Sequence, residues 1–79
     1  MKQKKHLAIL GSTGSIGTQA LEVVSQHKDY FEVEVLTAQN NAALLIEQAK
    51  IFKPNAVVIV NEDHYAAVRE ALVPLDIKV

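Results

Sequence analysis

Three equally spaced glycines directly after an apolar run constrain this chain more than any other feature. Residues 7–10 read L-A-I-L, and the chain's only three glycines follow at Gly11, Gly14 and Gly17, where a helical pattern begins. A strand, a glycine turn and a helix in this order leave unpaired backbone N–H groups at a helix N-terminus, where the helix dipole also favours negative charge. The order therefore predicts a turn that binds the phosphates of a nucleotide.

Each glycine has a separate expected task in such a turn. Gly11 permits a sharp exit from the strand, Gly14 lets a ligand approach the backbone, and Gly17 allows the helix to pack tightly on the strand. The intervening hydroxyl groups are expected to add donors for phosphate oxygens: Ser12, Thr13 and Ser15. The spacing is G-x-x-G-x-x-G instead of the commoner G-x-G-x-x-G, and the alternative is a turn that only changes the chain's direction.

Segments typical of strands and of helices alternate along the chain. Strands are predicted at about 5–10, 31–37 and 56–60, helices at about 15–27, 41–52 and 62–73, and the opening of a fourth strand at 77–79. Such alternation indicates parallel strands joined by right-handed crossovers. The predicted fold class is α/β: a fragment of a Rossmann-like three-layer sandwich with the order βαβαβαβ and a mostly parallel sheet.

The apolar pattern also predicts which side chains face the core. The expected apolar face of the first helix consists of Ile16, Ala20, Val23, Val24 and His27. In the second strand, strict alternation puts Glu32 and Glu34 on the same face as Leu36. One face of the sheet is therefore expected to be in contact with water near the start of this strand.

Composition bounds the classes of function. A chain of 79 residues is one small domain at most, and 49% hydrophobic with 22% charged residues is typical of a globular protein. A net charge of −1 gives no general attraction to nucleic acid or to an anionic membrane. The absence of cysteine excludes disulfides and fits a reducing compartment. With no apolar run of membrane-spanning length and no signal-peptide pattern, we expect a cytoplasmic protein without membrane or nucleic-acid partners.

The end of the second strand indicates which nucleotide is bound. NAD-binding folds usually carry Asp or Glu there for the ribose 2′-hydroxyl, whereas residues 36–41 read L-T-A-Q-N-N. Because a carboxylate would repel a 2′-phosphate, its absence favours NADP over NAD. Four polar residues there are expected to donate neutral hydrogen bonds to the cofactor: Thr37, Gln39, Asn40 and Asn41. Asn41 has an alternative role as the cap of the second helix.

Two other kinds of site find no support in the sequence. No G-K-[ST] follows the glycines, so a Walker-type phosphate loop is excluded. The three histidines lie far apart in the sequence, and the acidic residues next to His64 suit the start of a helix. No metal site and no catalytic residue are therefore predicted within this chain.

Longer motifs carry a likeness to a known family. The block G-S-T-G-S-I-G-T-Q-A-L-E-V-V is followed by F-E-V-E-V-L-T-A, by A-x-x-N-x-x-L-L-x-x-Q at 38–48, by F-K-P-N at 52–55 and by V-V-I-V at 57–60. Together they resemble the opening of the 1-deoxy-D-xylulose 5-phosphate reductoisomerases, and the likeness covers essentially the whole chain. Members often carry Gly-Lys where this chain has Gln39-Asn40.

The resemblance implies an NADPH-dependent enzyme of non-mevalonate isoprenoid biosynthesis. Such enzymes isomerise 1-deoxy-D-xylulose 5-phosphate and reduce the product to 2-C-methyl-D-erythritol 4-phosphate, with a divalent metal (Mg, Mn or Co), and usually form homodimers. The implied NADPH contacts are Thr13, Gly14, Ser15, Ile16 and Asn41. The resemblance also implies that residues 1–79 are a partial N-terminal NADPH-binding domain. The catalytic and C-terminal domains, with the metal and sugar-phosphate sites, are then absent, and the chain alone is expected to be inactive.

Two further interpretations stay open at this stage. The chain could be the cofactor half of a semialdehyde-dehydrogenase-type enzyme or an atypical short-chain reductase, which also use G-x-x-G-x-x-G turns. It could also be a non-catalytic α/β module that self-associates through an exposed sheet edge.

Overall fold

The fold alternates strands and helices as predicted. The computed structural model describes residues 4–79, so the first three residues of the predicted domain lie outside the described residues. The elements are β1 (Lys5–Ile9), α1 (Ser15–Gln26), β2 (Phe31–Ala38), α2 (Ala42–Phe52), β3 (Ala56–Ile59), the 3-10 helix η1 (Glu62–His64), α3 (Tyr65–Leu72) and the 3-10 helix η2 (Val73–Leu75).

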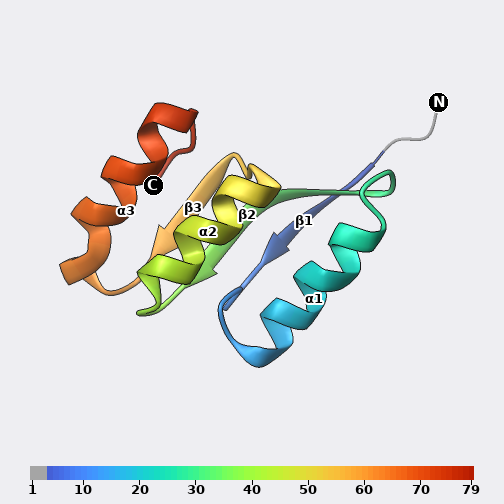
Figure 1. Ribbon diagram of the computed structural model, residues 1–79, viewed down its shortest axis with the longest axis horizontal. Helices are drawn as coiled ribbons and strands as arrows, with labels where there is room; N and C mark the ends of the chain where they lie inside the picture. Colours follow the sequence, from blue (N-terminus) through green and yellow to red (C-terminus); the bar gives the residue numbers. More distant parts are fainter. Residues whose placement is uncertain (1–3) are drawn as a thin grey trace.

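The strands form one parallel sheet in the order β1-β2-β3 (Figure 1). The predicted fourth strand at 77–79 makes a single parallel bridge between Lys78 and Ala56 rather than a strand of its own. This segment is held beside β3 by the N–H of Val57, which donates to the carbonyl of Lys78 at 2.8 Å. The parallel α/β class is confirmed.

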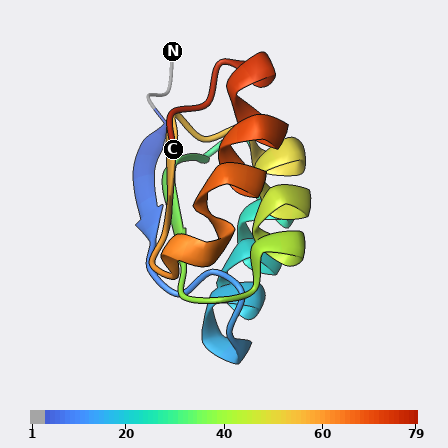
Figure 2. The same ribbon diagram turned by 90° about the vertical axis from the view of Figure 1, so that its left-hand side faces the viewer.

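All three α-helices cover one face of the sheet (Figure 2). The strands follow one another across the sheet in chain order, so every crossover moves in the same direction. Right-handed crossovers that all move in one direction place every helix on the same face of the sheet. The described residues thus contain two layers of a Rossmann-like sandwich, the sheet and one layer of helices. None of the described helices is long and apolar enough to cross a membrane.

The core lies between the sheet and these helices. Its most deeply buried apolar side chains, with at most 1% of their surface exposed, come from β2, α2, β3 and α3: Leu36, Leu45, Ala49, Val57, Val68 and Leu72. Burial at this level stabilises each large aliphatic side chain by about 1.5–3 kcal/mol. Leu21 and Val24 of α1 belong to the same buried cluster, and Leu7 and Ile9 of β1 pack against it, so the elements on either side of the glycine turn share this core.

Helix α1 packs on a face that matches its predicted apolar face only in part. Its buried residues are Gly17, Leu21 and Val24, so the prediction for Val24 is confirmed. Ile16, Val23 and His27 are exposed. The reason is the close approach of Gly17 to the glycine turn, which fixes the rotation of the helix. The expectation for Ile16, Val23 and His27 was wrong because a glycine adds nothing to an apolar pattern.

Strand β2 contains a bulge that overturns its expected alternation. Leu7 pairs with Val33 and Ala8 with Val35, so Glu34 is the extra residue between the two pairs. A bulge shifts the following residues by one position, which brings Leu36 into the core together with Val33. Glu32 and Glu34 therefore do not share a face with Leu36, as strict alternation predicted.

Candidate dinucleotide-binding site

The glycine turn connects the end of β1 to the start of α1. Gly11 has a φ of +68°, a left-handed conformation that side chains rarely adopt. The N–H of Gly14 donates to the carbonyl of Gly11 at 3.0 Å and closes the turn. Gly11 therefore provides the sharp exit that the sequence predicted.

Gly17 packs against the start of the turn with no room for a side chain. A Cβ at this position would lie 2.2 Å from the carbonyl oxygen of Gly11 and 2.6 Å from the Cα of Ser12. Real Cβ atoms essentially never come this close to backbone atoms. The predicted role of Gly17 in tight packing is confirmed, with the turn itself as its partner.

Thr37 of β2 anchors the turn to the neighbouring strand. Its hydroxyl oxygen accepts a hydrogen bond from the N–H of Gly11 at 2.9 Å, and its carbonyl accepts one from the N–H of Ser12 at 2.8 Å. Thr37 was expected to donate to the cofactor, and its anchoring of the turn was not predicted. The turn is thereby tied to the strand that leads to Gln39.

Ser12 has a structural role that differs from its expected one as a phosphate donor. Its side chain is fully buried, and its hydroxyl donates to Oε1 of Gln48 at 2.7 Å. In return Nε2 of Gln48 donates to the carbonyl of Ser12 at 2.8 Å. The Ser12 hydroxyl is directed into the protein because Gln48, a buried polar residue of α2, needs partners there.

The start of α1 presents free backbone donors at an exposed edge. The N-cap is Gly14, so no side chain caps the helix, and no acidic residue lies in its first turn. Within residues 4–79 no hydrogen bond is found for the N–H groups of Thr13, Ser15, Ile16 or Gly17. Gly14, Ser15 and Ile16 are exposed. These donors and the helix dipole form a site that suits a phosphate.

Gly14 leaves this site open, although the backbone conformation at this position does not require a glycine. Its φ of −80° and ψ of 175° suit any residue, and a Cβ would meet only the carbonyl oxygen of Gly11, at 3.4 Å. A larger side chain at Gly14 would therefore fit the fold and would extend toward the exposed donors. The position is free for a ligand.

The polar residues after β2 lie exposed at the neighbouring corner of the sheet. Oδ1 of Asn41 accepts from the N–H of Leu44 at 3.2 Å, so its alternative role as a helix cap is confirmed. Oδ1 of Asn40 accepts from Nδ2 of Asn61 at 2.9 Å. Both amide oxygens are used within the protein, and the amide N–H groups of both residues are left as donors.

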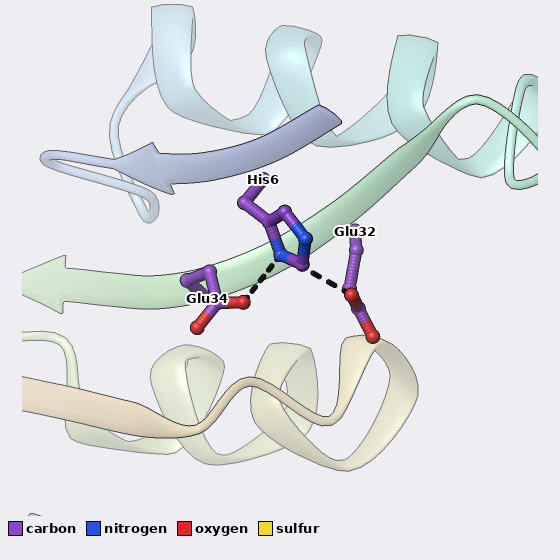
Figure 3. A group of neighbouring side chains, drawn as sticks. All are labelled: His6, Glu32 and Glu34. Atoms are coloured by element: carbon purple, nitrogen blue, oxygen red, sulfur yellow. Dashed lines mark hydrogen bonds and ion pairs between the residues drawn. The ribbon is translucent and has the colours of Figure 1, made fainter. Parts of the chain in front are cut away.

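One group of side chains was not anticipated from the sequence. His6 of β1 lies between Glu32 and Glu34 of β2, at the opposite end of the strands from the glycine turn (Figure 3). His6 is isolated from other candidate ligands in the sequence, and only the pairing of β1 with β2 brings these residues together.

Comparisons with known proteins agree on one family. A family model described as 1-deoxy-D-xylulose 5-phosphate reductoisomerase matches residues 7–79. The chain is 59% identical to a protein of that name from Phocaeicola vulgatus over 76 residues, which are 96% of this chain and 20% of the relative.

Solved structures give the same result. The enzyme of that name from Zymomonas mobilis, in complex with NADPH, matches with a TM-score of 0.91 and 32% identity over 99% of this chain and 21% of that one. A DOX-P reductoisomerase with NADPH, fosmidomycin and magnesium matches with a TM-score of 0.86 and 30% identity, over 94% of this chain and 18% of that one. The chain thus spans about a fifth of the length of the relatives it matches. The two other interpretations are not favoured.

Proposed function

The chain belongs to the 1-deoxy-D-xylulose 5-phosphate reductoisomerase family, and we propose that residues 1–79 are its N-terminal NADPH-binding segment. The observation that carries this proposal is the uncapped, exposed start of α1 next to a strand end that has no carboxylate. The first feature suits a pyrophosphate, and the second suits a ribose that carries a 2′-phosphate.

In this proposal the pyrophosphate lies against the start of α1. The N–H groups of Thr13, Ser15, Ile16 and Gly17 provide the donors, and Gly14 leaves room for the phosphate. Gly11 and Ser12 shape the turn from behind. The hydroxyl of Ser15 is exposed and remains a candidate donor.

The adenosine 2′-phosphate lies at the end of β2 in the same proposal. Gln39, Asn40 and Asn41 are exposed there, and their amide groups offer N–H donors without a negative charge. Thr37, two residues before Gln39, holds the turn through both of its hydrogen bonds. The two halves of the cofactor site are therefore connected through one residue.

We further propose that the segment serves a cytoplasmic, homodimeric enzyme that converts 1-deoxy-D-xylulose 5-phosphate to 2-C-methyl-D-erythritol 4-phosphate. Bound NADPH supplies the hydride in that reaction. The residues described here bind and orient the cofactor, and none of them is assigned a catalytic role. The divalent metal and the sugar phosphate are proposed to bind residues outside this chain.

The edge of the sheet at β1 fits this assignment. Within the described residues β1 has a partner only in β2, so its other edge is free. In doubly wound folds the ligand binds at the carboxyl ends of the strands where the strand order reverses. The glycine turn lies at the carboxyl end of this edge strand, where such a reversal would take place.

The proposal is tested by calorimetric titration of the chain with NADPH and, in parallel, with NADH. Selective binding of NADPH supports both halves of the site. Equal affinity for the two cofactors would overturn the assignment of the strand end to the 2′-phosphate, and the absence of binding by the folded chain would overturn the assignment of the turn.

A further inference from the structure

A histidine and two carboxylates converge on the face of the sheet that the helices leave uncovered (Figures 2 and 3). Nδ1 of His6 lies 2.5 Å from Oε1 of Glu34 and 3.2 Å from Oε2 of Glu32. One ligand atom from each residue can be chosen so that all three lie within 4.8 Å of one another. One carboxylate oxygen of each glutamate therefore faces the same nitrogen of the His6 ring.

The pairing of the strands holds this group together. His6 lies opposite Glu32 in the register of β1 and β2, so their side chains are neighbours on one face. Glu34 is the extra residue of the bulge, and a bulge redirects the side chain that it inserts. The bulge thus brings a second carboxylate to the same histidine.

Asn55 fixes Glu34 from the other side. The Nδ2 of Asn55 donates to the second carboxylate oxygen of Glu34, and the N–H of Asn55 donates to the carbonyl of Glu34 at 2.9 Å. One oxygen of Glu34 is held by the amide, and the other is left directed at His6. Second contacts of this kind orient the ligands of metal sites.

We propose that His6, Glu32 and Glu34 form a binding site for a transition-metal dication such as Zn²⁺. In the structure Nδ1 of His6 points at an oxygen of each carboxylate, so a metal ion between them would be held by this nitrogen and by two carboxylate oxygens. Tetrahedral Zn²⁺ holds ligands at about 2.0–2.2 Å, which places them about 3.3–3.6 Å apart. The observed separations are within reach of small side-chain rotations.

The mixed donor set selects the class of metal. Imidazole nitrogen suits zinc, copper and nickel, whereas magnesium prefers oxygen ligands and retains its waters. His6 and Glu32 are about half exposed, with 56% and 53% of their side-chain surface accessible, so water can complete the coordination. Three protein ligands with an open position are typical of non-structural zinc sites.

This site is separate from the proposed cofactor site. His6 and Glu32 lie near the starts of their strands, and the glycine turn follows the end of β1, five residues further on. At about 3.3 Å per residue the two sites are roughly 15 Å apart along the strand. The inference therefore does not depend on NADPH binding.

The test is calorimetric titration of the metal-free chain with zinc sulfate, followed by Co²⁺ substitution and absorption spectroscopy. We expect saturable 1:1 binding that excess Mg²⁺ does not displace. His6→Gln and Glu32→Gln should each lower the affinity more than about tenfold, since even indirect partners of a metal contribute that much.

Matched controls exclude a general effect of histidine or charge. His64→Gln removes another histidine next to two acidic residues, and Glu47→Gln removes an exposed carboxylate of α2. Both should keep the wild-type affinity. The inference is overturned if zinc does not saturate, if His6→Gln binds it as well as wild type does, or if His64→Gln weakens binding equally. Circular dichroism confirms that each variant is folded.

Discussion

Gly17 and Gly11 are in backbone contact, so close that a Cβ on Gly17 would lie 2.2 Å from the Gly11 carbonyl oxygen. This contact sets the rotation of α1 and brings the start of the helix against the end of β1. The free N–H groups of the first turn are therefore held at a fixed place next to the sheet.

Gly17→Ala should destabilise the fold by at least about 1–3 kcal/mol, the usual cost of forcing a methyl group into a packed site. The obstacle is the backbone of Gly11 and Ser12, so a rotamer change cannot relieve it and the backbone itself must shift. Urea unfolding measures the change. Gly14→Ala is the matched control and should cost far less, because its Cβ would meet only one atom, at 3.4 Å. Equal stability of the two variants would contradict the account of the turn.

Gly14→Asp should separate the stability of the chain from its ligand binding. Asp is a better N-cap than glycine and suits the helix dipole, so the free energy of unfolding should rise by about 0.5 kcal/mol. The same carboxylate would face the pyrophosphate, and like charges in contact cost several kcal/mol. Titration should therefore show NADPH affinity lowered more than about tenfold in a more stable protein. An unchanged affinity would show that the phosphates do not lie at Gly14.

Ser12→Ala should destabilise the chain by about 1–3 kcal/mol, because it leaves the buried Oε1 of Gln48 without its donor. The matched control is Ser25→Ala. Ser25 is exposed, and its hydroxyl donates to the carbonyl of Glu22 within the same helix. That variant should change the free energy of unfolding by less than about 0.5 kcal/mol. Similar losses in the two variants, measured by urea unfolding, would refute the structural role of Ser12.

Two substitutions of Asn41 should separate capping from cofactor selectivity. Asn41→Ala removes the acceptor for the N–H of Leu44 and should cost about 1 kcal/mol of stability. Asn41→Asp keeps the cap and adds the charge that NAD-binding folds usually carry at this place. We expect it to weaken NADPH binding and to leave NADH binding unchanged or stronger. A variant that binds both cofactors as wild type does would place the 2′-phosphate elsewhere.

The sequence predicted the order of elements, the parallel sheet and the tight packing of Gly17, because apolar periodicity and glycine spacing are local signals. It did not predict the packed face of α1 or the position of Leu36. The first depends on a backbone contact with Gly11, and the second depends on a bulge that inserts Glu34. The packed face of α1 and the burial of Leu36 both depend on contacts between elements that are separate in the sequence.

The candidate sites divide in the same way. The phosphate-binding turn and the strand end without an acid could be identified from neighbouring residues. The burial of Ser12 required its partner Gln48, which lies 36 positions away. The group around His6 required the pairing with residues of β2, 28 positions away for Glu34. Contacts at such separations leave no periodic pattern in a single sequence.

The most direct test of the central proposal is a calorimetric titration of the chain with NADPH against NADH, with Gly14→Asp alongside. The account predicts 1:1 binding of NADPH to the wild-type chain. The affinity for NADH should be lower by about tenfold or more, because NADH lacks the charged 2′-phosphate and its hydrogen bonds. The folded Gly14→Asp variant should lose NADPH binding. A folded wild-type chain that binds neither cofactor, or that binds NADH as tightly as NADPH, would contradict it.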